Sequence, residues 1–418
     1  MKVGKEIPLD KSLDNTLTLL SEGFNFIPNR REQYQSDIFE TRLLGQKAIC
    51  FSGEEAAKAF YDEERFIRKG AIPKRIEKSL FGEKGVQTLD GAEHKQRKGM
   101  FMSVMTHENL DRLVGITEAN WKAIVPKWQK KKEINLFQEA TEVLFRVACD
   151  WAGVPYKERK VSGMAKDLAE MVDAFGGVGP RYQRGKFARK RMEKWGGDII
   201  NQVRTGKLTP PEYSAAYKIS HHRDLDGELL DEKVAAVELL NIIRPIVAIS
   251  IYIVFGAVAL YQFPKTRAKI KTGDQEYMKM FVQEVRRFYP FGPFLGARVR
   301  KDFLWEGYLF KKGTLVILDL YGTNHHPDLW NQPDNFLPER FKDWKGSPFN
   351  FIPQGGGDYD TGHRCAGEWV TVKVMQTTMD FLVNQIKYDV PDQDLSYSTV
   401  RMPTMPESGF NMTNVKEI

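Results

Sequence analysis

One cysteine lies between a glycine-rich loop and a predicted helix in FIPQGGGDYDTGHRCAGEWVTVKVMQTTMDFLVNQI, residues 351–386. Apolar residues recur there at spacings of three and four, which predicts a helix with one buried face: Val372, Met375, Met379, Leu382 and Ile386. Cys365 is then at or just before a helix N-terminus, where backbone N–H groups and the helix dipole stabilise a thiolate. That thiolate could be a nucleophile or the single protein ligand of a metal, and a lone cysteine can also be a small core residue.

The most apolar stretch of the chain, LLNIIRPIVAISIYIVFGAVAL at 239–260, contains Arg244 and Pro245 side by side. A buried, unpaired arginine costs several kcal/mol, so Arg244 is expected to bind an anion. A carboxylate suits it, because it accepts two parallel hydrogen bonds from a guanidinium, and the apolar remainder of the helix suits an alkyl chain. Pro245 removes a backbone hydrogen bond and is expected to kink or open the helix beside the arginine. The alternative partner of Arg244 is a protein carboxylate such as Glu238.

Two further pairs lie at helical spacing. Glu284 and Arg287 are three residues apart in a predicted helix, and Arg340 follows in the sequence PERF. His94 and Lys98, in DGAEHKQRKGMF, share a face of another predicted helix. Taken singly, the first pair is typical of a surface salt bridge and the second of a solvated polar face.

Taken in order, these motifs resemble the cytochrome P-450 superfamily. The resemblance implies that Cys365 is the axial thiolate ligand of the iron of a haem b, a ligand that donates electron density to the metal. It implies that a structural triad behind the haem is formed by Glu284, Arg287 and Arg340. It also implies that the haem propionates are bound by His94, Lys98 and His363. The phenylalanine usual seven residues before the cysteine is missing, and Asp358 occupies that position.

The helix that crosses the haem in most members of the superfamily carries an acid–threonine pair, and residues 234–261 contain no threonine. The chain instead resembles the bacterial fatty-acid peroxygenase branch in segments such as RPIVAIS, FVQEVRRFYPFGPFLG and LDLYGTNH. This implies that hydrogen peroxide oxidises a long-chain fatty acid and that no redox partner is required. The substrate carboxylate, bound by Arg244, would act as the acid–base group while the O–O bond breaks heterolytically at the thiolate-ligated haem. The attack would fall at the α or β carbon, because the carboxylate is fixed.

The catalytic residues expected from this resemblance are Arg244, Pro245 and Gln87. The position of Gln87 is a histidine in strongly decarboxylating members of the branch, and a glutamine cannot act as an acid or base at neutral pH. The prediction is therefore mainly β-hydroxylation, with some α-hydroxylation and a minor yield of terminal alkene. The resemblance places Phe81 beside the substrate, and Phe294 is predicted to line the pocket wall, although both could equally be core residues.

The elements that must position these residues are mostly helices. Residues between about 90 and 290 show helical periodicity, for example in DQEYMKMFVQEVRRFY at 274–289, which Pro290 ends. Strand-like segments are few: 40–52, 297–310 and 314–320. With no repeat or linker, the prediction is a mainly α cytochrome P-450 fold with a minor β portion, in one domain over 1–418.

The composition fits a protein with a large core. The 418 residues are 42% hydrophobic and carry a net charge of +7, which suits an anionic cofactor or substrate and does not indicate nucleic acid. Three cysteines and no apolar leader segment favour a reducing, cytoplasmic location. The apolar run 245–260 is short for a transmembrane segment and is interpreted as a buried helix.

Other functions fit parts of the sequence. A reductase-fed monooxygenase would keep the haem, and the basic segment 183–195 could dock a redox protein, although a solvated helix face is the commoner explanation. A non-catalytic haem or fatty-acid binding protein is a second alternative. A separate metal or nucleotide site is rejected, because the histidine pairs at 221–222 and 325–326 lack ligand partners and no Walker motif is present.

Overall fold

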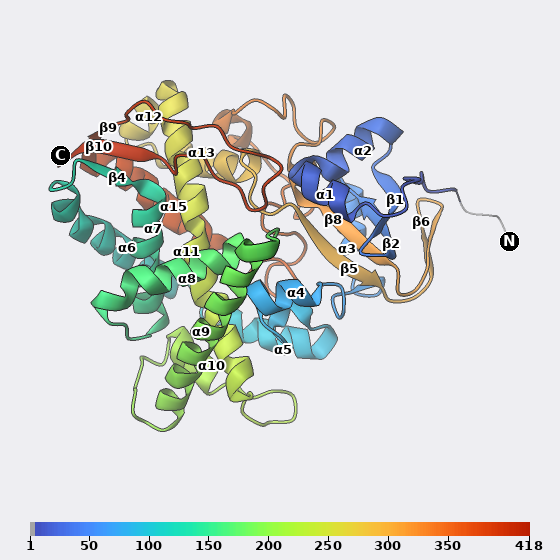
Figure 1. The fold of residues 1–418 in the computed structure, drawn as a ribbon, viewed down its shortest axis with the longest axis horizontal. Helices are drawn as coiled ribbons and strands as arrows, with labels where there is room; N and C mark the ends of the chain where they lie inside the picture. The colour runs from blue at the N-terminus through green and yellow to red at the C-terminus, as the bar shows by residue number, and fades with distance from the viewer. Residues whose placement is uncertain (1–4) are drawn as a thin grey trace.

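The computed structural model describes residues 5–418, which form a larger helical part and a smaller part built around a β-sheet (Figure 1). The longest helix, α11 (Glu232–Gln262), runs through the middle of the helical part. The Asp231 side chain caps its N-terminus, and residues 235–260 are buried except for Pro245. The helices that pack most extensively against it are α7 (Leu136–Ala152), α9 (Gly179–Arg204) and α15 (Glu368–Asp380).

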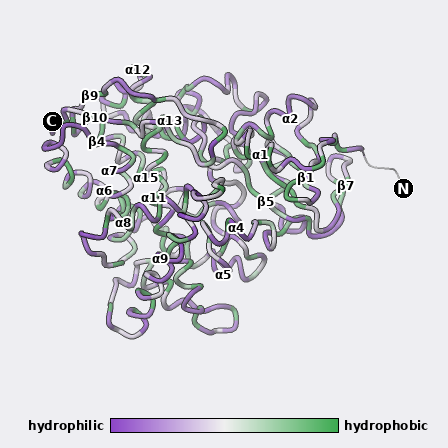
Figure 2. The backbone as a smooth tube through the Cα atoms, viewed as in Figure 1, coloured by the Kyte–Doolittle hydropathy of each residue, from purple (hydrophilic) through white to green (hydrophobic). Residues whose placement is uncertain are grey.

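The remaining helices surround this centre. They are α1 (Thr16–Glu22), α2 (Phe26–Tyr34), α3 (Glu54–Phe60), α4 (Lys74–Ile76), α5 (Gly91–Met102), α6 (His107–Trp128), α8 (Val161–Asp173), α10 (Ala215–Ser220), α12 (Pro264–Lys271), α13 (Gln275–Phe288) and α14 (Leu320–Asn324). Hydrophobic residues gather toward the interior, and the loops at the periphery are largely hydrophilic (Figure 2).

The main sheet has five strands in the order β1-β2-β8-β5-β3. Their bounds are β1 (Ile38–Leu43), β2 (Gln46–Phe51), β3 (Phe66–Ile67), β5 (Phe294–Val299) and β8 (Leu315–Asp319). Strands β2 and β8 are parallel, whereas the other neighbours are antiparallel. The smaller sheets are formed by β4 (Glu133–Asn135), β10 (Asn411–Glu417) and β9 (Ile386–Asp389), and by β6 (Phe303–Trp305) and β7 (Tyr308–Phe310).

The predicted fold class is confirmed, with helices dominating and strands a minor portion. The helix expected at 274–289 is α13, and it ends before Pro290. One detail was wrong: Ile386 does not continue the helix that follows Cys365. After Asp380 the chain makes a π-helical turn, Phe381–Gln385, and Ile386 begins strand β9, where backbone pairing with β10 replaces the helical hydrogen bonds.

Helix α11 is the one helix of residues 5–418 long and apolar enough to cross a bilayer. In the fold, 89% of its most apolar window is buried inside the protein. This burial agrees with the interpretation of the run as a core helix.

Candidate active site

Cys365 lies at the end of the glycine-rich loop, three residues before α15 begins. Its backbone N–H donates to the carbonyl of Gln354 over 3.3 Å, and the Gln354 side-chain amide lies 3.9 Å from Sγ. Gly357, with φ of +82°, permits the close approach of the loop to Tyr61, because a Cβ there would lie 3.0 Å from the ring. The Asp358 carboxylate accepts hydrogen bonds from Thr361, which closes the turn at the position where a phenylalanine is usual.

The environment of Cys365 distinguishes the chemistries open to it. Burial raises the pKa of the Cys365 thiol, and the nearby Glu368 carboxylate raises it further. A cysteine nucleophile needs a lowered pKa, whereas a bound metal ion deprotonates a thiol directly. The arrangement therefore suits a metal ligand better than a free nucleophile.

A group of buried cations and imidazoles lies beside this loop. His94 and Lys98 project from one face of α5, and the His94 ring stacks on that of His363 with centroids 3.7 Å apart. Lys98 donates to the carbonyl of Arg364. Arg68, which the sequence patterns did not single out, is also buried here. The nearest ion-pair contact of this group is long, 4.0 Å between His363 Nε2 and Asp90.

These groups fit the two carboxylates of a haem. Burial and, to a smaller extent, the charge of Lys98 lower the pKa of His94 to about 4. The Nδ1 atom of His94 is buried without a hydrogen-bond partner in the described chain. Burial also lowers the pKa of Arg68 to about 10. Within residues 5–418, the side chains of Arg68 and Lys98 donate only to backbone carbonyls. Cations buried without a carboxylate partner are costly, and propionate groups would compensate them.

Glu284 and Arg287 of α13 form a compact ion network with Arg340. The Glu284 carboxylate accepts two hydrogen bonds from Arg287, at 2.8 and 2.9 Å, and one from Arg340 Nε at 3.2 Å. It also accepts the backbone N–H of Leu337, which anchors the loop that carries PERF. The three residues predicted as a triad are thus brought together, and all are buried or nearly so.

Arg244 is buried and pairs with neutral acceptors. Its guanidinium donates to the carbonyl of Leu80 and, over 3.4 Å, to Asn241 Oδ1, and it lies 5.4 Å from the Phe81 ring. It forms no ion pair with a carboxylate of residues 5–418. Burial lowers the pKa of Arg244 to about 9, and the charge of Arg189 acts in the same direction. The charge of the Cys365 thiolate raises the pKa of Arg244, so Cys365 and Arg244 are close enough to interact.

The alternative pairing of Arg244 with Glu238 is wrong. Glu238 Oε1 lies 2.7 Å from Arg97 Nη1, so a different arginine neutralises it. The sequence could not indicate this partner, because Arg97 lies 141 residues away.

Residues on both sides of Arg244 shape its surroundings. Helix α11 continues through Pro245, and this residue alone between 235 and 260 is partly exposed. Gln87, on the short helical turn Val86–Thr88, accepts a hydrogen bond over 3.4 Å from Asn241 Nδ2, whose amide oxygen in turn accepts from Arg244. Phe294 lies at the start of β5, with its ring centroid 6.2 Å from that of Phe175.

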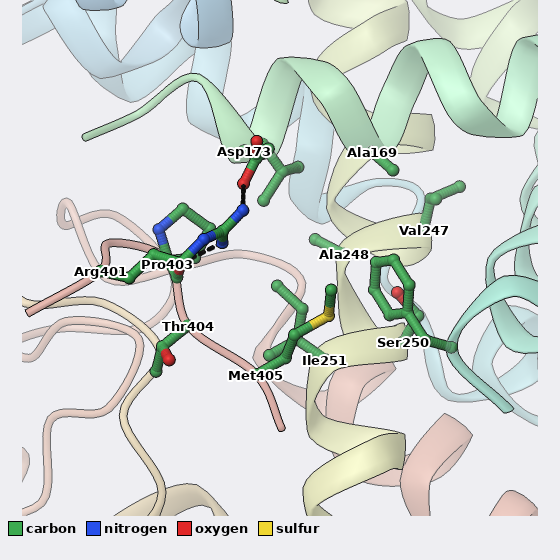
Figure 3. Close-up of a pocket in the computed structure, with 12 residues that line it drawn as sticks. Ala169, Asp173, Val247, Ala248, Ser250, Ile251, Arg401, Pro403, Thr404 and Met405 are labelled. Atoms are coloured by element: carbon green, nitrogen blue, oxygen red, sulfur yellow. Dashed lines mark hydrogen bonds and ion pairs between the residues drawn. The ribbon is translucent and has the colours of Figure 1, made fainter. Parts of the chain in front are cut away.

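A small cavity lies beside α11 beyond Arg244 (Figure 3). Its walls include Val247 and Ile251 from the helix and Met405 from the C-terminal loop, and the Arg401–Asp173 ion pair lies at its side. Its volume of about 30 Å³ holds one or two water molecules and not an alkyl chain.

Besides Arg97, three residues of this region were missed from the sequence: Gln354, Arg68 and Asn241. Asn241 had a usable signal, because it is a polar residue one helical turn before Arg244 in an otherwise apolar stretch. Gln354 and Arg68 had none, because only the folded loops place them near Cys365 and His94.

The fold and the site define a haem-thiolate enzyme. Residues 271–406 match the family model for cytochrome P-450. The structure is similar to that of cytochrome P450EX alpha with myristic acid, with 50% identity, coverage of 99% of this chain and 100% of that one, and a TM-score of 0.96. It is also similar to a variant of cytochrome P-450 OleT in complex with arachidonic acid, with 40% identity, 99% coverage of each chain and a TM-score of 0.96.

A more distant relative is the protopanaxadiol 6-hydroxylase of Panax ginseng, 23% identical over 90% of this chain and 85% of that protein. The chain belongs to the cytochrome P-450 family, in the branch that includes P450EX alpha, and its cofactor is a haem with a cysteine thiolate ligand.

Proposed function

We propose that this protein uses hydrogen peroxide to hydroxylate long-chain fatty acids, mainly at the β carbon and partly at the α carbon, with minor decarboxylation to terminal alkenes. The observation that carries the proposal is Arg244, a buried guanidinium without a carboxylate partner in residues 5–418. The fatty acids present in two similar structures supply the kind of anion that it would bind.

Arg244 holds the substrate carboxylate through two parallel, charge-assisted hydrogen bonds. The carbonyl of Leu80 and the amide of Asn241 orient the guanidinium, and Phe81 covers one of its faces. The apolar residues that follow on α11 exclude water from the alkyl chain. Because the carboxylate is fixed, the α and β carbons are the ones held at the reaction centre.

Cys365 would hold the haem through its iron, and the bound haem would supply peroxide activation and oxidation of the C–H bond. Its propionates would be held by His94, Lys98, His363 and Arg68, with the triad of Glu284, Arg287 and Arg340 supporting the adjacent loop. The substrate carboxylate at Arg244 would accept a proton from hydrogen peroxide and return it to the oxygen that leaves as water. The second oxygen of the peroxide would be transferred to the α or β carbon. Gln87 stays neutral at working pH, which favours hydroxylation over decarboxylation.

The test is product analysis after hydrogen peroxide is added to the purified protein with myristic or palmitic acid, without any reductase. Hydroxy acids are the expected product. In Arg244→Ala the yield should fall at least about 100-fold, because a charge-assisted bidentate contact is lost. The exposed Arg184→Ala should match the wild type. A requirement for a reductase would indicate a monooxygenase, and spectral binding without turnover would indicate a binding protein; either result overturns the proposal.

A further inference from the structure

Glu238 is a fully buried carboxylate that none of the steps above uses. Its Oε1 accepts hydrogen bonds from Arg97 Nη1 at 2.7 Å and from the backbone N–H of Val86 at 2.9 Å. Its Oε2 accepts from Asn241 Nδ2 at 2.9 Å. One side chain thus joins α5, the turn that carries Gln87, and α11.

The hydrogen bonds of Asn241 fix the orientation of its amide. Besides Glu238, Nδ2 donates to Gln87 Oε1 over 3.4 Å, so both amide hydrogens point at acceptors. The carbonyl oxygen is left to face Arg244, from which it accepts over 3.4 Å. A rotated amide would instead direct its N–H groups at the guanidinium, and two donors cannot pair.

We propose that Glu238, held by Arg97, is a positioning residue that fixes the amide of Asn241 and thereby the placement of Gln87 and Arg244 toward the substrate carboxylate. The proposal rests on the function proposed above, because it gives Arg244 and Gln87 their roles.

The chemistry of the site calls for a carboxylate at this position. Three donors converge on the two oxygens of Glu238, and an ionised carboxylate is an acceptor only. A glutamine could satisfy Arg97 and Val86 with its oxygen, but its NH₂ would then face Asn241 Nδ2. Asn241 would rotate, and its N–H groups would turn toward Arg244.

Arg97 has a second effect in this arrangement. A buried carboxylate needs a counter-charge, and Arg97 supplies it from α5. Glu238 is therefore neutralised by Arg97 and does not compete for Arg244. The guanidinium of Arg244 is left available for a guest anion.

The experiment measures fatty-acid binding to the haem-loaded protein from the change in haem absorbance during titration with palmitic acid. Glu238→Gln is expected to weaken binding about tenfold, the size of one charge-assisted hydrogen bond, and to change the ratio of α- to β-hydroxy acid. The control is Glu232→Gln, the same change at an exposed position in the first turn of α11, which should bind like the wild type. Unchanged binding and product ratio in Glu238→Gln would overturn the proposal.

A double-mutant cycle separates positioning from simple support of the fold. Asn241→Ala leaves the Arg97–Glu238 pair in place and should reproduce the loss of affinity. If Glu238 acts through Asn241, the double variant should bind no more weakly than either single variant, whereas additive losses would contradict the proposal. If Glu238→Gln fails to fold, Asn241→Ala alone decides, and wild-type affinity in that variant refutes the inference. A wild-type protein that neither binds nor oxidises palmitic acid would instead refute the function proposed above.

Discussion

Two arginines near the start of α11, the partly buried Arg97 and the buried Arg244, have opposite surroundings. Arg97 has a carboxylate partner in Glu238, whereas Arg244 has only the carbonyl of Leu80 and the amide oxygen of Asn241. A full charge met by neutral dipoles is incompletely compensated in a low-dielectric interior. The difference between the two sites therefore identifies Arg244, rather than arginines in general, as the one suited to an external anion.

At the same scale, Gln87→His should raise the alkene fraction of the products several-fold. Gln87 lies within hydrogen-bond reach of Asn241, and an imidazole there could exchange a proton near the substrate, which an amide cannot do. The measurement is the ratio of terminal alkene to hydroxy acid from palmitic acid and peroxide. Gln129→His, at an exposed position on the far end of α6, provides the control. An unchanged ratio would remove Gln87 from the catalytic residues.

Among the elements, the short helix α14 depends on a buried acid. Asp319 ends β8 and caps α14 by accepting the backbone N–H of Gly322, while its other oxygen is buried and has no hydrogen-bond partner in residues 5–418. Burial raises the pKa of Asp319 from 3.8 to about 7. The folded state thus holds this proton more tightly than the unfolded chain.

The free energy of unfolding should consequently decrease as the pH rises from about 4 to about 7, by at most about 4 kcal/mol for this group. Asp319→Asn keeps the acceptor for Gly322 but cannot ionise. The free energy of unfolding of this variant should therefore not decrease in this way between about pH 4 and about pH 7. Urea unfolding at several pH values measures it, and the exposed Asp111→Asn should follow the wild type. Parallel pH profiles for wild type and Asp319→Asn would rule out a buried ionisation at this position.

Element types could be predicted where one face is apolar over many residues, as in α13, or where the whole segment is apolar, as in α11. The spacing rule failed at Ile386, because pairing with β10 is made by residues about thirty positions further on. Motif order was enough to bring Cys365, Glu284, Arg287 and Arg340 into consideration. The partners of Glu238 and the contacts of Gln354 could not be predicted, because they depend on side chains that only the folded chain brings together.

For the whole molecule, the distribution of unpaired charge predicts how folding depends on the cofactor. Arg68, Lys98 on α5 and Arg244 on α11 are buried cations, and none of them forms an ion pair in the described residues. Burial lowers the pKa of all three. Anionic propionates would compensate the first two, so the haem should contribute to stability beyond its apolar contacts.

Removal of the haem should therefore lower the unfolding temperature, since a ligand present at 1,000 times its Kd stabilises a protein by about 4 kcal/mol. Lys98→Met should destabilise the haem-loaded protein, which loses a propionate contact, but not the haem-free protein, which loses an uncompensated buried charge. The gap in unfolding temperature between the two forms should thus narrow in Lys98→Met and stay unchanged in Lys95→Met, a change at an exposed position on the same helix. Calorimetry of six preparations, the haem-loaded and haem-free forms of the wild type and of each variant, measures the three gaps. Equal gaps in the two variants would mean that Lys98 is satisfied by the protein alone, through the carbonyl of Arg364, and does not face a propionate.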